Sequence, residues 1–103
     1  MQLLKYLGLP ELTNEQTEKL CLKAETTARK YVQSKISKKA IETFDINVEA
    51  QGTKPIILAI DVNIALSPSV KNLDVQKLAN ESIQEAFKFA EEYLRELKCH
   101  SQK

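Results

Sequence analysis

Histidine, cysteine and glycine are scarce in this chain of 103 residues, and each scarcity excludes a class of site. The one histidine is His100, and the two cysteines, Cys21 and Cys99, do not have the spacing of metal ligands. Two glycines provide no dinucleotide-binding GxGxxG motif, no P-loop and no nucleophile elbow. We therefore expect no metal, no cofactor and no enzymatic activity in this chain alone.

Long apolar runs and a large excess of one charge are also absent. No stretch approaches the ~20 apolar residues that a membrane span requires, and the first residues lack the apolar core of a signal peptide. The formal net charge of +1 creates no general attraction to nucleic acid or to membranes. We expect a cytoplasmic protein that does not bind membranes.

The composition that remains is typical of one globular domain. Hydrophobic residues make up 43% and charged residues 28%, which argues against a disordered chain. We expect a single domain over residues 1–103, with 1–11 and 99–103 loosely ordered.

Two long amphipathic helices are predicted, one near each end. The first begins at Thr13 or Asn14, where Gln16 completes a capping box. The second begins after Asp74 and runs to about Lys98. The apolar stripe of the first helix covers roughly 120° of its surface, but that of the second covers roughly 180°, which is more than a single contact requires. The second helix is therefore expected to contact another chain.

Two strands lie between the helices. Apolar and polar residues alternate from Phe44 to Ala50, which is typical of a half-buried strand. Residues 51–53 form a short turn into a second strand over 54–66, which the break at Ser67-Pro68-Ser69 ends. By alternation, one face of this hairpin carries a polar set, interpreted as solvated: Asp45, Asn47, Glu49, Asp61 and Asn63.

The predicted fold class is α+β, in the order α-β-β-α, with an antiparallel hairpin sheet packed by the two helices. A lone hairpin is marginally stable in water, so we expect a partner chain to complete the sheet. The expected exposed sheet edge consists of Ile56, Ile57, Leu58, Ile60, Val62 and Ile64. The expected interface on the second helix consists of Leu78, Ser82, Ala86, Phe89 and Tyr93, or alternatively of the opposite flank with Ile83, Phe87 and Leu94.

A basic stretch without acids joins the first helix to the hairpin. It suits sequence-independent contact with RNA phosphates, or else it places cations at the negative end of the helix dipole. The candidate RNA contacts are Arg29, Lys30, Lys35, Lys38 and Lys39.

Nearly the whole chain, from "LGLPELTNEQTEKL" to "FAEEYLREL", resembles a small archaeal family of unknown function. That family is similar to a paralogue of the Pcc subunit of the KEOPS complex, which makes the threonylcarbamoyl modification of tRNA. The shared elements are the hairpin, the step at Leu73-Asp74 and the long second helix. The Pcc subunit usually begins with a strand, whereas residues 1–12 here have a poor strand pattern.

The resemblance implies a non-catalytic accessory subunit that forms a heterodimer with a Pcc-type subunit and limits or bridges the assembly. Its helices would receive helices of the catalytic KEOPS subunit. Contact with tRNA is possible within the complex, and a homodimer is possible when the chain is alone. The alternatives are a homodimeric KH-like RNA-binding module and a chaperone-associated adaptor.

Overall fold

The computed structural model describes residues 2–7, 12–51, 56–68, 70 and 73–101, apart from the side chains of 5–7, 56 and 97–101. The fold is α+β, as predicted, but it has three strands where the sequence indicated two. The elements are β1 (Gln2–Leu7), α1 (Asn14–Lys35), the short 3-10 helix η1 (Lys38–Ala40), β2 (Ile41–Gln51), β3 (Ile56–Leu66) and α2 (Val75–Ser101).

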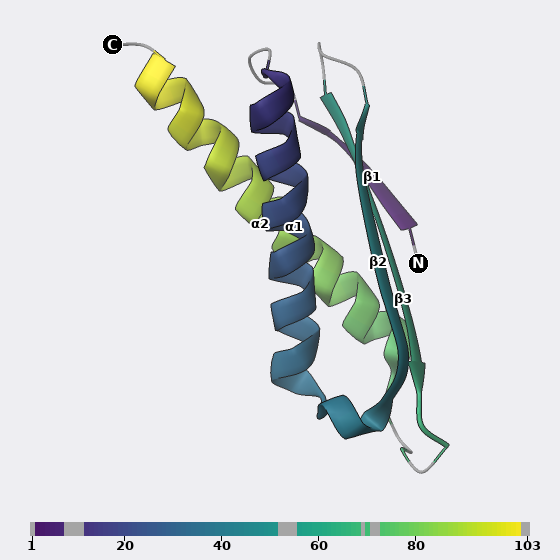
Figure 1. Cartoon of the computed structure of the whole chain (residues 1–103). Coiled ribbons are helices and arrows are strands. Elements are labelled where there is room, and N and C mark those ends of the chain that lie inside the picture. The colour runs from purple at the N-terminus through teal and green to yellow at the C-terminus, as the bar shows by residue number, and fades with distance from the viewer. Residues whose placement is uncertain (1, 8–11, 52–55, 69, 71–72, 102–103) are drawn as a thin grey trace.

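The molecule has two layers, an antiparallel sheet and a pair of crossing helices that cover one face of it (Figure 1). The strand order is β1-β3-β2. Both described long helices lie on the same face of the sheet, so no described helix covers the other face. Neither described helix combines the length and apolarity needed to cross a membrane.

The strand predicted to be an exposed edge is the central strand, so this prediction was wrong. β1 pairs with β3 from Gln2 opposite Asp61 to Leu7 opposite Ile56, and β2 pairs along the other side of β3. The third strand therefore comes from the same chain and not from a partner. The correction applies to the whole predicted edge set, Ile56, Ile57, Leu58, Ile60, Val62 and Ile64.

The first helix begins as its sequence indicates. The backbone N–H of Gln16 donates to Thr13 Oγ1 (3.1 Å), and the backbone N–H of Thr13 donates to Gln16 Oε1 (3.0 Å), which completes the capping box. The buried stripe repeats every four residues, as one side of a helix requires. It consists of Leu20, Ala24, Ala28 and Val32.

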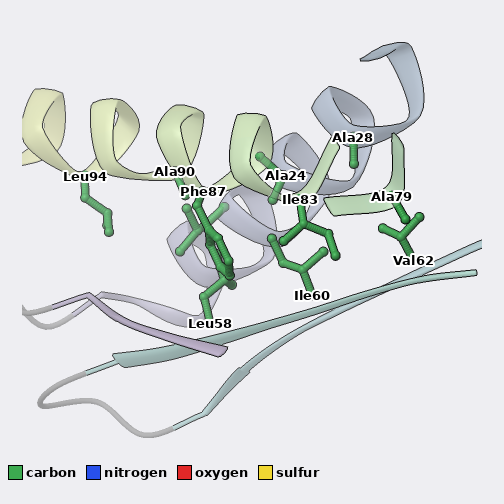
Figure 2. Packing of buried hydrophobic residues seen from close by; sticks show 12 residues of the cluster. Ala24, Ala28, Leu58, Ile60, Val62, Ala79, Ile83, Phe87, Ala90 and Leu94 are labelled. Carbon is green, nitrogen blue, oxygen red and sulfur yellow. The ribbon is translucent and has the colours of Figure 1, made fainter. Parts of the chain in front are cut away.

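The second helix is capped by Asp74, whose Oδ1 accepts the backbone N–H of Lys77 (3.0 Å). One flank of α2 faces the sheet: Figure 2 shows Ile83 and Phe87 pointing toward Ile60 and Leu58 of β3. The other flank meets α1, where Leu78 packs with Val32 and Ile36. The wide apolar arc of α2 is thus used by two contacts within one chain.

This arrangement overturns most of the predicted interface on α2. Leu78, Ser82 and Ala86 are buried, with exposed fractions of 5%, 0% and 0%. The Ser82 hydroxyl is satisfied inside the helix, because it donates to the carbonyl oxygen of Ala79 (2.7 Å). The alternative flank is buried as well, at Ile83, Phe87 and Leu94. Of the predicted interface, Phe89 is exposed and Tyr93 is half-buried.

Candidate protein-interaction surfaces

The outer edge of β2 is the longest open edge of the sheet. Within the described part of the chain, β2 pairs with β3 on one side and with no strand on the other. Its 11 residues, IETFDINVEAQ, include neither lysine nor proline, the residues that commonly protect an edge from association. One register shift, between Ile41 and Thr43, interrupts the pairing with β3. The remainder, from Thr43 to Gln51, is a regular strand whose outer side pairs with no described strand.

A half-buried apolar row lies along this edge. These side chains face the helices and pack against the core, but their outer sides stay accessible because no strand covers them. The row in the central strand differs, since Leu58, Ile60 and Val62 are exposed by 0%, 0% and 1%. A strand added beside β2 would bury the row as β1 and β2 bury β3. The row consists of Phe44, Ile46, Val48 and Ala50.

The opposite face of the sheet is polar next to the same edge, as the alternation predicted. The register places Asp45 opposite Asn63 and Asn47 opposite Asp61. Asn63 Nδ2 donates to Asp61 Oδ2 (3.3 Å) across this face. Among the described residues, no group of three or more histidine, cysteine or acidic side chains is arranged to hold a metal ion.

A groove of ≈ 470 Å³ lies where the outer side of α1 meets α2. Its apolar floor includes two side chains that are unusually exposed for their size, Leu22 at 63% and Phe89 at 37%. The other lining residues are two threonines and two lysines: Thr26, Thr27, Lys23 and Lys30.

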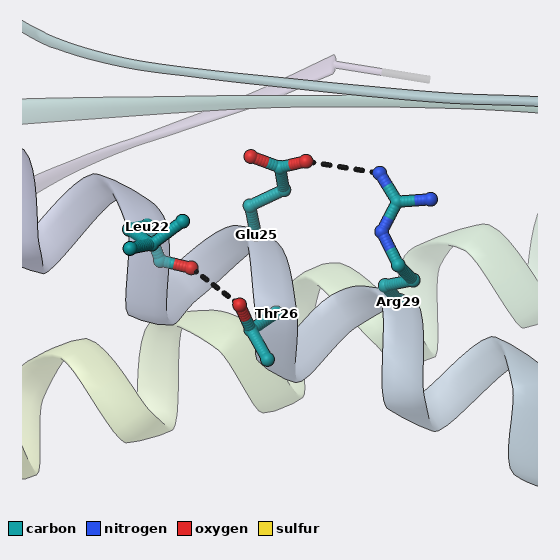
Figure 3. Close-up of polar contacts among 4 residues, drawn as sticks. All are labelled: Leu22, Glu25, Thr26 and Arg29. Atoms are coloured by element: carbon teal, nitrogen blue, oxygen red, sulfur yellow. Dashed lines mark hydrogen bonds and ion pairs between the residues drawn. The ribbon is translucent and has the colours of Figure 1, made fainter.

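The threonines of the groove use their hydroxyl protons within α1. Thr26 Oγ1 donates to the carbonyl oxygen of Leu22 and Thr27 Oγ1 to that of Lys23, both at 2.8 Å. Figure 3 shows the first of these bonds. A ligand in the groove would therefore meet mainly apolar surface beside the lysine charges.

Lys23 links the two helices above this floor. Its Nζ lies 5.8 Å from the ring centroids of both Phe89 and Tyr93, within the range of a cation–π interaction. Sequence reasoning selected the two rings but missed Lys23 and Leu22. The available signal was weak: Leu22 lies outside the apolar stripe of α1, but single exposed leucines are common on protein surfaces.

The predicted basic stretch does not form one surface. Arg29 donates to Glu25 Oε1 (2.9 Å), as Figure 3 shows, and lies 5.4 Å from the ring centroid of Phe44 in β2. Lys30 lies on a different side of α1, in the groove with Phe89. These two residues are therefore not part of a common phosphate-binding patch.

The other three cations are exposed near the end of α1. Lys35 Nζ lies 5.5 Å from the ring centroid of Tyr31, and Lys38 and Lys39 are in η1. They are the part of the basic stretch still suited to phosphate contact. The pKa of Tyr31 is raised, first by burial of its hydroxyl. The negative charge of Glu81 and a hydrogen bond to its side chain raise it further, as does the negative charge of Glu85.

Cys21 is a half-buried thiol beside the end of β2. Burial raises its pKa above the ordinary value of 9.0, the negative charge of Glu49 adds to this, and a hydrogen bond with the Ala50 backbone partly opposes it. The side chains of Cys99 and His100 lie outside those that the structure describes.

Known proteins resemble this chain in sequence and in fold. The chain is 26% identical over 92 residues to the uncharacterized protein TK0644 of Thermococcus kodakarensis. The matched region covers 89% of this chain and 84% of TK0644. It resembles a crystal structure from Thermococcus onnurineus NA1 with a TM-score of 0.81 and 25% identity, covering 97% of this chain and 96% of the other.

A second solved structure shares the fold. The solution structure of the hypothetical protein mth677 from Methanothermobacter thermautotrophicus superposes with a TM-score of 0.70 at 20% identity, covering 86% of this chain and 96% of the other. The model of the family described as "Protein of unknown function (DUF3194)" matches residues 9–93. With most of its length matched, the chain belongs to the DUF3194 family, which has archaeal members.

Proposed function

We propose that this chain is a non-catalytic, cytoplasmic accessory subunit of a KEOPS-type tRNA-modification complex. In this proposal it forms a heterodimer with a Pcc-type subunit and limits or bridges the assembly. The observation that carries the proposal is the open edge of β2, with its row of half-exposed apolar side chains.

Edge pairing would satisfy two requirements of β2 at once. A strand from the partner would accept and donate hydrogen bonds along the outer backbone, which is the mode of recognition called β-augmentation. It would also remove from water the exposed parts of Phe44, Ile46 and Val48. The interface therefore moves from β3, where the sequence had suggested it, to β2.

The order of elements supports the choice of a Pcc-type assembly. The Pcc subunit usually begins with a strand before its first helix, and here β1 occupies that position. The resemblance noted from the sequence thus extends to the one element that had seemed to be missing. Archaeal relatives fit the archaeal distribution of the family that the sequence resembles.

The groove between α1 and α2 is our proposed contact with the catalytic KEOPS subunit. It replaces the buried flank of α2, and it keeps Phe89 as the aromatic anchor, with Leu22 beside it. Large apolar side chains often supply most of the binding energy of an interface. The exposed Lys35, Lys38 and Lys39 would contact tRNA only within the assembly, because three surface lysines alone give weak affinity.

The test is to measure mass by light scattering for the chain alone and mixed with a Pcc-type subunit from the same organism. We expect a heterodimer, with slowed hydrogen exchange at the amides of β2. The variant Val48→Lys places an inward-pointing charge in the half-buried row and should abolish pairing, since an inward-pointing charge on an edge strand opposes strand addition. Leu4→Lys, at a position of β1 that is 64% exposed, is the matched control and should pair normally.

Circular dichroism must show that both variants are folded before their masses are compared. The proposal fails if the wild type ignores the Pcc-type subunit. Edge pairing through β2 fails if Val48→Lys pairs as well as Leu4→Lys does.

A further inference from the structure

The carboxylates beside the β2 edge are concentrated on one face of the sheet. Asp45 and Glu49 are exposed on the outer face of β2, and Asp61 lies opposite Asn47 in the neighbouring strand. By alternation and register, the described positions of this outer face include no lysine or arginine. With a net charge of only +1 for the whole chain, this is a local acidic surface and not a general property.

Pairing of β2 with a second copy of itself would bring these charges together. In an antiparallel pair related by a twofold axis, the two outer faces must coincide, so the axis passes through a residue. An axis at Asn47 sets Asp45 opposite Glu49 twice. An axis at Asp45 or at Glu49 sets that carboxylate opposite its own copy.

The intermediate registers do not avoid the repulsion. An axis at Ile46 sets Asp45 opposite Asn47 but leaves Glu49 of the copy diagonal to it, and an axis at Val48 leaves the two Glu49 side chains diagonal. Like charges at opposite or diagonal positions destabilise a sheet pair. Every register centred between residues 45 and 49 therefore places carboxylates of one copy beside those of the other.

The apolar row on the inner face does not distinguish a second copy from a different chain, because any strand of suitable shape would bury it. We infer that β2 pairs with an edge strand of a different polypeptide, one that carries lysine or arginine on its outer face opposite Asp45 and Glu49. This inference rests on the proposed edge pairing and adds to it the charge that selects the partner. The acidic residues reject a second copy, and the basic strand is the occupant that relieves their repulsion.

A charge-inverted copy of the chain is a suitable probe, because it has the same apolar row as the wild type. The double variant Asp45→Lys/Glu49→Lys is mixed with the wild type, and association is measured by analytical ultracentrifugation at low and at high salt. In the register centred on residue 47, each lysine lies opposite a carboxylate. The matched control is Glu18→Lys/Glu92→Lys, which makes the same change of net charge at exposed helix positions.

We expect the wild type and the Asp45→Lys/Glu49→Lys variant to form a mixed dimer that is about tenfold tighter than either homodimer, as two favourable cross-strand pairs would give. High salt should reduce this preference, because these charges are exposed.

Three outcomes would overturn the inference: a wild-type homodimer as tight as the mixed dimer, an equal preference for the helix control, or no association in any mixture. The proposed function is judged separately, since it depends on the Pcc-type subunit and on Val48→Lys. A Pcc-type heterodimer that is unaffected by inverting Asp45 and Glu49 would contradict the charge selection alone.

Discussion

Two phenylalanines separated by one residue in α2 should lose very different amounts of stability when each is truncated to alanine. Phe87 is 3% exposed and points toward Leu58 in the centre of the sheet (Figure 2), whereas Phe89 is 37% exposed beside Lys23. Replacing a buried phenylalanine by alanine removes its apolar contacts and leaves a cavity, which costs about 3–5 kcal/mol. For Phe89→Ala we expect a loss of about 1 kcal/mol, from a partly buried ring and an exposed cation–π contact.

Thermal and urea unfolding measured by circular dichroism would check these magnitudes. For a domain of this size, 1 kcal/mol shifts Tm by roughly 4–8 °C, so Phe87→Ala should lower Tm by roughly 12–40 °C. Should Phe87→Ala not fold, Phe87→Leu gives a measurable substitute at about 1 kcal/mol. If Phe89→Ala destabilises the protein as much as Phe87→Ala does, the assignment of the two sides of α2 is wrong.

Three further predictions concern the first helix and its surroundings. Thr13→Ala should lower the free energy of unfolding by about 0.5–2 kcal/mol because it removes the capping box. Thr26→Ala, within the helix, should lower it by less. Equal losses for the two variants would contradict the role of Thr13 as the cap. In a Cys99→Ser background, labelling of Cys21 by a thiol reagent should require a higher pH in the folded protein than in the unfolded chain. The reason is that the raised pKa of the Cys21 thiol leaves less thiolate at any given pH. An unshifted pH profile would refute this assignment. Within the assembled complex, tRNA affinity should become less salt-dependent, by about 2–3 in the logarithmic slope, when three lysines are changed to alanine, and an unchanged slope would exclude them as phosphate contacts. These lysines are Lys35, Lys38 and Lys39.

The helices, the hairpin and the polar face were predictable because each has a strong local signal. The capping box at Thr13, the N-cap at Asp74 and the alternation in β2 depend on neighbouring residues alone. The register then placed Asp45 and Asn63 on one face, as alternation required.

The third strand was not predictable in the same way. Leu3 packs against the core while Leu4 is 64% exposed on the opposite face, so β1 has apolar residues on both sides and no alternation. Its pairing with β3 depends on residues far away in the sequence. Missing this strand also misplaced the open edge, since only β1 makes β3 central.

The two contacts of α2 show a similar limit. A wide apolar arc indicates that a helix has more than one neighbour, but it does not indicate whether a neighbour belongs to the same chain. Here α1 covers the flank that contains Leu78, and the sheet covers the flank that contains Phe87. Phe89 was selected from the sequence, but Leu22 and Lys23 could be placed beside it only when the crossing of the helices was known.

The position of β1 also has a consequence for the order of folding. β2 and β3 are neighbours in sequence, whereas Gln2 must find Asp61 across most of the chain. Closing such a long loop costs more conformational entropy, so contacts of this kind form later than local ones. Before β1 docks, the hairpin exposes both of its edges, and the apolar centre of β3 is open to other chains. We therefore expect β1 (Gln2–Leu7) to pair late in folding and, once paired, to cover the edge of β3 that would otherwise be open to other chains.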